Sequence, residues 1–253
     1  MSTRENGSLY THIENKVAMV EFGHPASNSF PSVLLERLQQ EIDKLSENPE
    51  VNVIVLKSEG EKAFCAGASF NELIAIEDLQ SGKEFFSGFA NVINAMRKCK
   101  KLIVGRVQGK TVGGGVGLVA ACDYAMATEA ASIKLSELSI GIGPFVIAPA
   151  VERKIGVAAL GELTLAAHEW KNAYWAKEKG LYARVFESIK DLDKEVQIFS
   201  EKLASYNPQA LHEMKKSLWK NTENWGELLQ ERAAISGELV LSDFTKKALA
   251  KFK

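Results

Sequence analysis

The first two thirds of the chain contain short segments in which apolar and polar residues alternate. Leu9 to Glu14 and Lys16 to Phe22 alternate in this way, and Asn15 between them fits a turn. This pattern predicts a pair of strands. Apolar runs rich in β-branched residues predict further buried strands. The predicted strands after the first pair are Val51 to Lys57, Leu102 to Val107, Tyr124 to Thr128, Ser132 to Leu135 and Gly180 to Phe186.

Between these strands, apolar residues return every three or four positions, which predicts amphipathic helices. The first helix would begin after a cap at Asn28 or Ser32. Its apolar face would carry Leu34, Leu35, Leu38, Ile42 and Leu45. Further helices are predicted from about Ser69 and over Gly82 to Cys99, Val116 to Cys122, Ala148 to Ile155, Leu160 to Ala166 and Ala173 to Lys179.

Strand signals end at about Leu192, and the rest of the chain has helical spacing and more charge. Strands that alternate with helices indicate an α/β fold. We therefore predict a core at residues 1–192 and a helical region at residues 193–253. Such a tail does not easily form an independent core, so we expect it to pack on the main body or on a neighbouring subunit.

Composition excludes several classes of protein. The chain has 253 residues, of which 46% are apolar and 25% charged, with a net charge of −1, as in one large globular domain. It has no basic nucleic-acid footprint, no polybasic membrane patch and no apolar run near the roughly 20 residues that span a bilayer. Three cysteines without close pairs favour a reducing compartment. The polar N-terminus is unlike a signal peptide, so we predict a cytoplasmic protein with no nucleic-acid or membrane partner.

Two glycine turns lie where a strand signal gives way to a helix: Ala66-Gly67-Ala68 and Gly113-Gly114-Gly115. A glycine turn leaves a backbone N–H accessible, and the first N–H groups of a helix are unpaired and favour negative charge. Two such N–H groups pointing at one oxygen would form an oxyanion hole. Each turn by itself is equally consistent with a tight connection.

The second turn also fits another function. Gly115, Gly117 and Ala120 match the dinucleotide-binding fingerprint, and Glu137 follows at about the right distance for a ribose contact. However, that motif requires a strand that runs directly into the first glycine, and residues 108–112 intervene between the predicted strand and the glycines. A nicotinamide-dependent oxidoreductase is therefore the less favoured alternative.

Four segments, in order and with near-family spacing, resemble the crotonase (enoyl-CoA hydratase/isomerase) superfamily. Lys62 to Leu73 resembles the segment K-x-F-C-A-G-A-D-L-x-E-L, and Val107 to Asp123 resembles V-x-G-x-x-x-G-G-G-x-E-L-x-x-x-C-D. Ser136 to Gly141 resembles P-E-x-x-x-G, and Pro25 to Phe30 resembles R-P-x-x-x-N-A-L. The resemblance covers about Val17 to Phe186.

The resemblance implies an α/β spiral of repeated ββα units with a helical C-terminal region that forms trimers or dimers of trimers. It implies an acyl-CoA thioester substrate, with coenzyme A as part of the substrate and no separate cofactor. The oxyanion donors would be the backbone N–H groups of Ala68 and Gly114. The substrate-binding residues would be Ala26, Ala66, Phe70 and Gly113. Lys247 or Lys251 would be a candidate contact for the CoA phosphates, although solvated surface is the simpler interpretation of both.

The sequence departs from the family pattern at one catalytic position. Hydratases of the family use two glutamates, because one group must activate water while a proton is delivered to the α-carbon. Gly117 stands at the first of these positions and Glu137 at the second. A single glutamate beside an oxyanion hole suits a Δ3,Δ2-enoyl-CoA isomerase, in which one carboxyl group removes and returns the proton. A raised pKa would assist Glu137, and its neighbours Leu135, Leu138 and Ile140 make burial plausible.

Alternatives remain open from the residues alone. A hydratase acting on an unusual or branched acyl-CoA is the second hypothesis, because Gly143 to Pro149 replaces the usual P-G-x-G-G-T loop that shapes the acyl pocket. A decarboxylase and a catalytically silent acyl-CoA-binding subunit are further hypotheses. Asp123 matches the family's structural aspartate. Glu72, Glu77 and Glu152 are expected on solvated helices, Cys65 as a small buried thiol, and no histidine pair has metal-ligand spacing, so we predict no metal.

Overall fold

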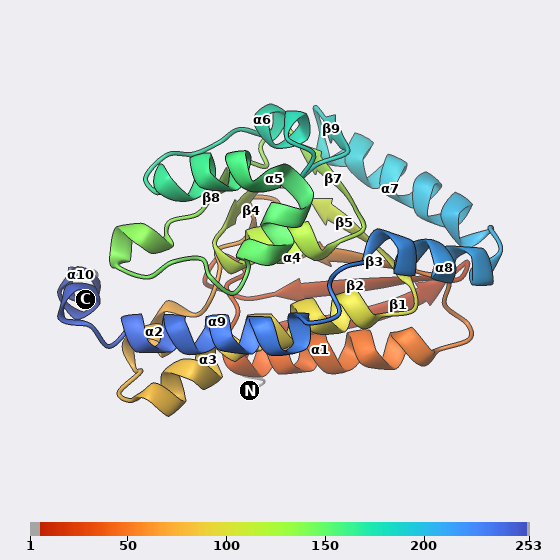
Figure 1. Ribbon diagram of the computed structural model, residues 1–253. Helices are drawn as coiled ribbons and strands as arrows, with labels where there is room; N and C mark the ends of the chain where they lie inside the picture. The colour runs from red at the N-terminus through yellow and green to blue at the C-terminus, as the bar shows by residue number, and fades with distance from the viewer. Residues whose placement is uncertain (1–5, 252–253) are drawn as a thin grey trace.

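The computed structural model describes residues 6–251 and contains two β-sheets surrounded by helices (Figure 1). The six-stranded sheet has the order β1-β2-β3-β5-β7-β9, and the three-stranded sheet has the order β4-β6-β8. Only the β1–β2 pair is antiparallel among the pairs of these two sheets. The strands are β1 Ser8–Glu14, β2 Val17–Gly23, β3 Val53–Ser58, β4 Ala63–Cys65, β5 Leu102–Val107, β6 Lys110–Val112, β7 Tyr124–Thr128, β8 Ile133–Lys134 and β9 Arg184–Phe186.

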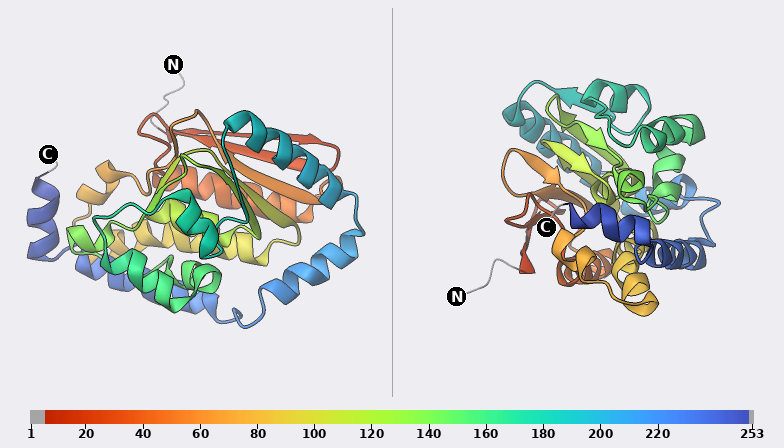
Figure 2. Two further views of the ribbon diagram at one scale, coloured as in Figure 1. Left: turned by 90° about the horizontal axis from the view of Figure 1, so that it is seen from above. Right: turned by 90° about the vertical axis from the view of Figure 1, so that its left-hand side faces the viewer.

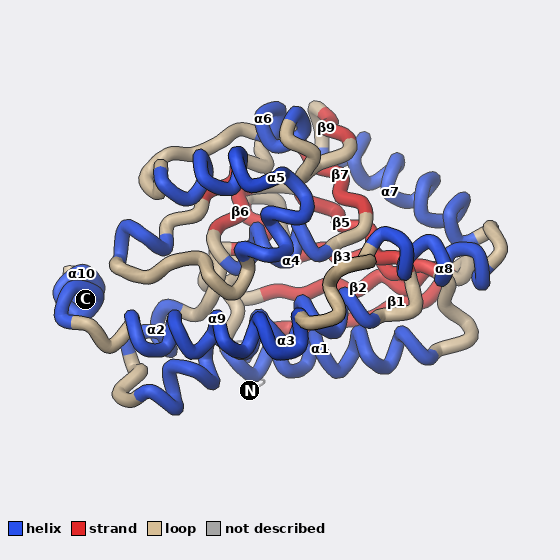
Figure 3. Tube along the Cα trace, viewed as in Figure 1, coloured by secondary structure: helices blue, strands red, loops and turns tan. Residues whose placement is uncertain are grey.

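The helices lie outside the strands, which form the centre of the molecule (Figure 3). They are α1 Ser32–Glu47, α2 Phe70–Ile74, α3 Leu79–Lys98, α4 Gly114–Ala121, α5 Ala148–Leu165, α6 Ala173–Glu178, α7 Ile189–Ala204, α8 Pro208–Leu218, α9 Trp225–Leu239 and α10 Asp243–Ala250, with a short 3₁₀ helix, η2, at Glu137–Ile140. None of the helices within residues 6–251 is long and apolar enough to cross a membrane.

The central parallel strands of the large sheet, β3, β5 and β7, are buried on both faces, as expected for parallel strands covered by helices. Along β3, Ile54 and Leu56 belong to the apolar cluster that includes the buried residues of α1 and α3. Val53 and Val55 point to the other face and pack in a cluster with Leu192 of α7. This alternation has the period of two that a strand imposes on its side chains. Figure 1 accordingly shows α7 on one side of the sheet and α1 with α3 on the other.

The chain repeats one unit: a strand in the large sheet, a short strand in the small sheet, and then a helix. The units are β3-β4-α2, β5-β6-α4 and β7-β8 followed by η2. The predicted spiral of ββα units is therefore present. Two strands were not predicted: β4, in a segment interpreted as leading into a turn, and β6, which runs directly into Gly113 where the sequence was interpreted as a connection.

The separate helices expected at 148–155 and 160–166 are present as the two arms of α5, whose helical geometry is interrupted at Gly156, where φ is +77°. The predicted cap of α1 is wrong. Neither Asn28 nor Ser32 caps α1 with its side chain. Instead, Glu72 of α2 accepts the Ser32 N–H at 2.9 Å, while the Asn28 amide donates to the carbonyls of Glu59 and Ala63.

The region from residue 193 is helical, as predicted, and packs on the body of the same chain. Helix α9 lies against α3, and their backbones approach so closely that a methyl group on Gly82 would lie 2.8 Å from the carbonyl oxygen of Gly237. Helix α7 covers the large sheet. Helix α10 lies at one end of the molecule, as seen in Figure 1 and in the left view of Figure 2. The expected boundary between residues 192 and 193 falls inside α7.

Candidate active site

The small sheet brings three segments of the chain to one place. Strands β4, β6 and β8 are parallel neighbours, so their carboxyl ends lie along the same edge. Ala66-Gly67-Ala68 follows β4, Gly113-Gly114 follows β6, and Leu135-Ser136-Glu137 follows β8. Parallel sheets commonly carry their functional residues at this edge. Three motifs that are separated by about 70 positions in the sequence thus become neighbours.

The first turn presents the backbone N–H of Ala68. Phe30 donates its N–H to the Gly67 carbonyl at 2.8 Å, and Ser69 donates to the Phe30 carbonyl at 2.8 Å. These two hydrogen bonds form a parallel bridge between Phe30 and Ala68. Because the bonds are made by the residues on either side of Ala68, the N–H of Ala68 itself points away from Phe30. Gly67 has a φ of +92°, a conformation in which a side chain is disfavoured.

The second turn presents the N–H of Gly114. Gly113 has a φ of +54° and donates its N–H to the Lys134 carbonyl at 3.0 Å. Gly114 is the first residue of α4, so its N–H has no partner within the helix. A methyl carbon placed on Gly67 would lie 3.8 Å from the Gly114 nitrogen. The two glycine turns are therefore in contact with each other.

Glu137 extends its carboxyl group towards the second turn. A methyl carbon on Gly113 would lie 2.9 Å from Oε1 of Glu137. The residue is half-buried as a whole, yet its Oε2 is buried and has no hydrogen-bond partner among residues 6–251. Burial raises the pKa of Glu137 to about 7, although the backbone N–H groups of Glu137 and Ser136 act in the opposite direction. Loss of water around an unpaired carboxylate is the cause, because burial disfavours the charged form.

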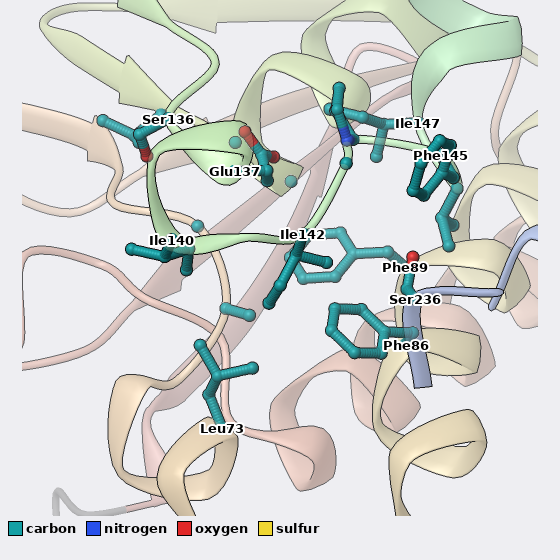
Figure 4. Close-up of a pocket in the computed structure, with 18 of the residues that line it drawn as sticks. Leu73, Phe86, Phe89, Ser136, Glu137, Ile140, Ile142, Phe145, Ile147 and Ser236 are labelled. Atoms are coloured by element: carbon teal, nitrogen blue, oxygen red, sulfur yellow. The ribbon is translucent and has the colours of Figure 1, made fainter. Parts of the chain in front are cut away.

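The carboxyl group and both turns line one cavity of about 170 Å³ (Figure 4). Glu137 is the sole ionisable side chain among the described residues that line it. The lining is otherwise largely apolar. Besides the two turns and η2, it comes from the end of β6, α2, α3, α9 and the loop after η2. Apart from Glu137, it consists of Ala66, Gly67, Ala68, Phe70, Leu73, Phe85, Phe86, Phe89, Val112, Gly113, Gly114, Ser136, Ile140, Ile142, Gly143, Pro144, Phe145, Val146, Ile147 and Ser236.

The space beside Gly117 is occupied by a side chain from another element. A methyl carbon on Gly117 would lie 2.4 Å from Cγ2 of Ile147, and Ile147 itself is buried. The position where hydratases of the resembled family carry a glutamate is therefore filled by an apolar side chain. The loop from Gly143 to Ile147 lines the cavity, as its unusual sequence predicted.

The other residues singled out from the sequence lie elsewhere. Ala26 is exposed and does not line the cavity, but its turn adjoins the first glycine turn because the Ala66 N–H donates to the Ser27 carbonyl at 3.1 Å. Lys247 and Lys251 are exposed on α10 and just after it. Leu138 is 40% exposed and does not line the cavity.

The other acidic residues named above and Cys65 lie outside the cavity lining. Glu72, Glu77 and Glu152 lie outside the cavity lining; Glu77 and Glu152 are exposed, and Glu72 is half-buried and accepts hydrogen bonds from Ser32. Asp123 is buried among partners of its own, as its match to a structural aspartate predicted. Cys65 is fully buried, and burial raises its pKa to about 12, so it is an unreactive thiol. In the described residues, no three His, Cys, Asp or Glu side chains gather as a metal site would require.

Several lining residues were not found from the sequence. Phe85, Phe86 and Phe89 were counted only as part of an amphipathic helix, and Phe89 in fact lies against Gly114. The clustering of these three phenylalanines within one predicted helix is the feature of the sequence that could have indicated a cavity wall. Ser236 reaches the cavity from α9 (Figure 4), and no local pattern distinguishes it from other small residues of an amphipathic helix.

Comparison with known proteins agrees with this geometry. A sequence model of the family described as enoyl-CoA hydratase/isomerase matches residues 12–252. The peroxisomal Delta(3,5)-Delta(2,4)-dienoyl-CoA isomerase of Arabidopsis thaliana is 29% identical over 197 residues, which are 72% of this chain and 69% of that protein. A short-chain-enoyl-CoA hydratase of Clostridium acetobutylicum is 28% identical over 207 residues, 81% of this chain and 78% of that protein.

Solved structures show the same fold. The structure of an enoyl-CoA hydratase from Bacillus halodurans matches with a TM-score of 0.88 at 20% identity, and the match covers 96% of this chain and 99% of that one. An enoyl-CoA hydratase from Bacillus anthracis matches with a TM-score of 0.79 at 27% identity over 92% and 90% of the two chains. The predicted crotonase fold, with two sheets and C-terminal helices, is confirmed. The family match over nearly the whole chain shows that this protein belongs to the enoyl-CoA hydratase/isomerase (crotonase) family of acyl-CoA enzymes.

Proposed function

We propose that the protein is an enoyl-CoA isomerase that shifts a double bond from the Δ3 to the Δ2 position of an acyl-CoA thioester. The observation that carries the proposal is the single carboxyl group in the cavity. Glu137 lies beside the two glycine turns, and Ile147 fills the space at Gly117 that a second glutamate would need. One acid and a stabilised enolate are sufficient for an isomerisation. Hydration needs a further group to activate water.

The proposed reaction uses the backbone of both turns. The thioester oxygen accepts hydrogen bonds from the N–H groups of Ala68 and Gly114. Ionised Glu137 removes a proton from C2 of the 3-enoyl thioester, and the electron pair moves into the conjugated system to give a dienolate with its charge on that oxygen. The two N–H groups stabilise this charge where it develops. Glu137 then returns the proton to C4, and the double bond lies between C2 and C3.

The environment of Glu137 suits both halves of this cycle. A group that first removes and then returns a proton works best when its pKa is close to the working pH. Burial places the pKa of Glu137 at about 7, so both of its forms are populated near neutrality. The apolar walls of the cavity also exclude water that would quench the dienolate.

The substrate-binding and assembly roles belong to the same proposal. Ala26, Ala66, Phe70 and Gly113 are proposed to contact the CoA thioester. Support comes from the adjoining backbones of the Ala26 turn and the Ala66 segment and from the place of the other three in the cavity lining. The helical region from residue 193 is proposed to form contacts between subunits of a trimer or dimer of trimers. It exposes large apolar side chains, including Ile198, Tyr206, Met214 and Leu218.

The direct test is spectroscopic turnover of 3-hexenoyl-CoA and of 2-hexenoyl-CoA by the purified protein. We expect the first to be converted to the conjugated isomer and the second to keep its conjugation. Glu137→Gln is expected to reduce the isomerisation by at least about 1,000-fold, because the amide neither takes nor returns a proton and the oxyanion donors alone remain.

Glu152→Gln is the matched control, since it makes the same chemical change on an exposed face of α5 outside the cavity. It is expected to retain full activity. Loss of conjugation in 2-hexenoyl-CoA instead would favour the hydratase hypothesis and require a second catalytic group. Turnover of neither compound would favour a decarboxylase or a non-catalytic acyl-CoA-binding subunit.

A further inference from the structure

Helix α10 contacts the turn that carries Glu137. Gly141 ends η2 with a φ of +83°. A methyl carbon on Gly141 would lie 2.5 Å from Cδ1 of Phe244 and 2.6 Å from Oγ1 of Thr245. Thr245 is fully buried, whereas most of the Phe244 ring is exposed. The absence of a side chain at Gly141 therefore allows α10 to approach the backbone of the turn directly.

The contacted backbone is linked to Glu137 by a short hydrogen-bonded ring. Gly141 donates its N–H to the Leu138 carbonyl at 3.1 Å, and Ile142 donates its N–H to the Glu137 carbonyl at 3.0 Å. A shift of Gly141 would consequently move the backbone of Glu137. Oε2 of the carboxyl group has no hydrogen-bond partner among residues 6–251, and the backbone N–H groups that act on the carboxyl group are those of Glu137 and Ser136, so its position depends on this backbone.

A small apolar cluster links the same region to the cavity wall. Its buried members come from α2, α3, the loop after η2, the end of α9, and α10: Leu73, Phe85, Ile142, Val240 and Leu249. Three of them, Leu73, Phe85 and Ile142, also line the cavity. The C-terminal residues thus support the wall and the Glu137 turn from behind.

We propose that Phe244 and Thr245 are positioning residues, and that α10 of the same chain holds the turn from Glu137 to Gly141 in its place at the cavity. The C-terminal region then completes the site within one chain, in addition to any role between subunits. The activity readout of this inference rests on the proposed isomerase function. The readout on the Glu137 carboxyl group does not.

The test is Phe244→Ala in the full-length protein, because the exposed ring can be removed without opening the core. We follow the ¹³C signal of the Glu137 carboxyl group during a pH titration, assigned by its loss in Glu137→Gln. We expect its pKa to fall from about 7 towards the ordinary 4.5, since a loosened turn lets water reach the carboxylate. Isomerisation of 3-hexenoyl-CoA is expected to fall about tenfold in kcat with little change in KM, as a displaced catalytic group does.

Three further variants separate positioning from general packing. Phe244→Leu keeps an apolar group against Gly141 and is expected to restore the pKa and kcat. Gly141→Ala, which forces a methyl group between the turn and α10, is expected to change both in the same direction as Phe244→Ala. Tyr10→Ala removes an aromatic ring of similar exposure on β1, outside the cavity lining, and is expected to change neither.

An unchanged pKa of Glu137 in both Phe244→Ala and Gly141→Ala would overturn the inference, even if the protein is an active isomerase. A lowered pKa in both, in a protein without isomerase activity, would support the positioning role and reject the proposed function. The two failures are therefore distinguishable.

Discussion

Glu137 is a carboxylic acid placed where its charged form is disfavoured. Most glutamates are solvated or paired, but Oε2 of Glu137 has neither water-accessible surface nor a hydrogen-bond partner in the described part of the chain. The neutral acid tolerates this site much better than the carboxylate does. The proposed reaction requires ionised Glu137, so the folded protein is less stable whenever this group is charged. Such a loss of stability is common for functional residues.

We therefore expect the free energies of unfolding of the protein and of Glu137→Gln to differ by an amount that depends on pH. Because the folded-state pKa of about 7 lies above the ordinary 4.5, the folded protein binds this proton more tightly than the unfolded chain. The stabilising contribution is complete below pH 4.5 and is lost as the pH rises through about 7. We expect urea unfolding at about pH 8.5 to give Glu137→Gln an advantage on the order of 2–3 kcal/mol.

At about pH 5 most of the advantage is expected to disappear, because the acid is then neutral in the folded protein and only the unfolded chain is partly ionised. Unfolding curves of both proteins at the two pH values measure the difference. An equal difference at both would mean that the substitution acts through packing rather than through ionisation of Glu137.

At the scale of elements, the site depends on strands too short to be recognised by alternation. Strands β4 and β6 have three residues each, which is too few for a period of two to be evident. The glycine turns themselves were predicted, because glycines before an apolar helix are a strong local signal. Their convergence follows from the order of the small sheet, and the sequence revealed that order only through its resemblance to the family.

The walls of the cavity were the least predictable part. Ile147 and Ser236 line the cavity from the loop before α5 and from α9, which are far apart in the sequence. A helical pattern shows which face of an element is apolar. It does not show which other element will cover that face, since this depends on the packing of the whole chain.

The contact between α4 and Ile147 leads to a prediction about Gly117. Alanine in the middle of a helix normally gains about 1 kcal/mol over glycine. Here the added methyl carbon would lie 2.4 Å from Cγ2 of Ile147, and such overpacking costs about 1–3 kcal/mol. We expect Gly117→Ala to lower the urea midpoint despite its better helix propensity.

Ile147→Ala supplies the matched control. The double variant is expected to be more stable than the sum of the two single changes predicts, because each change makes room for the other. Additive effects would show that Ile147 does not obstruct position 117. The same clash implies that Gly117→Glu alone would not recreate the two-glutamate arrangement of a hydratase, and that a smaller residue at 147 is needed as well.

At the scale of the whole molecule, the helical region from residue 193 is integrated into the core rather than added to it. Helix α7 covers the large sheet, α9 lies on α3, and α10 reaches η2. Helix α8 is anchored through Asp123, which follows α4. The apolar spacing of this region predicted its helices correctly. It gave no indication that α9 would contribute to the cavity, because the predicted partner surface was the outside of the body or another subunit.

The anchor at Asp123 gives the final prediction. Its carboxylate accepts hydrogen bonds from Lys215 of α8, from the Trp219 indole and from the Ile103 N–H, each at 2.7 Å. The side chains of Lys215 and Asp123 are only 3% and 4% exposed. Asp123→Ala therefore leaves a buried ammonium group without its partner, and the loss of one member of a buried pair costs about 3–5 kcal/mol.

We expect urea unfolding of Asp123→Ala to show this loss, and Asp123→Leu combined with Lys215→Met to recover much of it, because an apolar pair avoids the desolvation of either charge. Glu47→Ala removes one side of the exposed Glu47–Lys100 pair and is expected to change little, since solvent screens that interaction. If Asp123→Ala were no more harmful than Glu47→Ala, Lys215 would have to find water or another acceptor. The docking of α8 would then rest on the packing of Trp219 against Trp225 rather than on the buried ion pair.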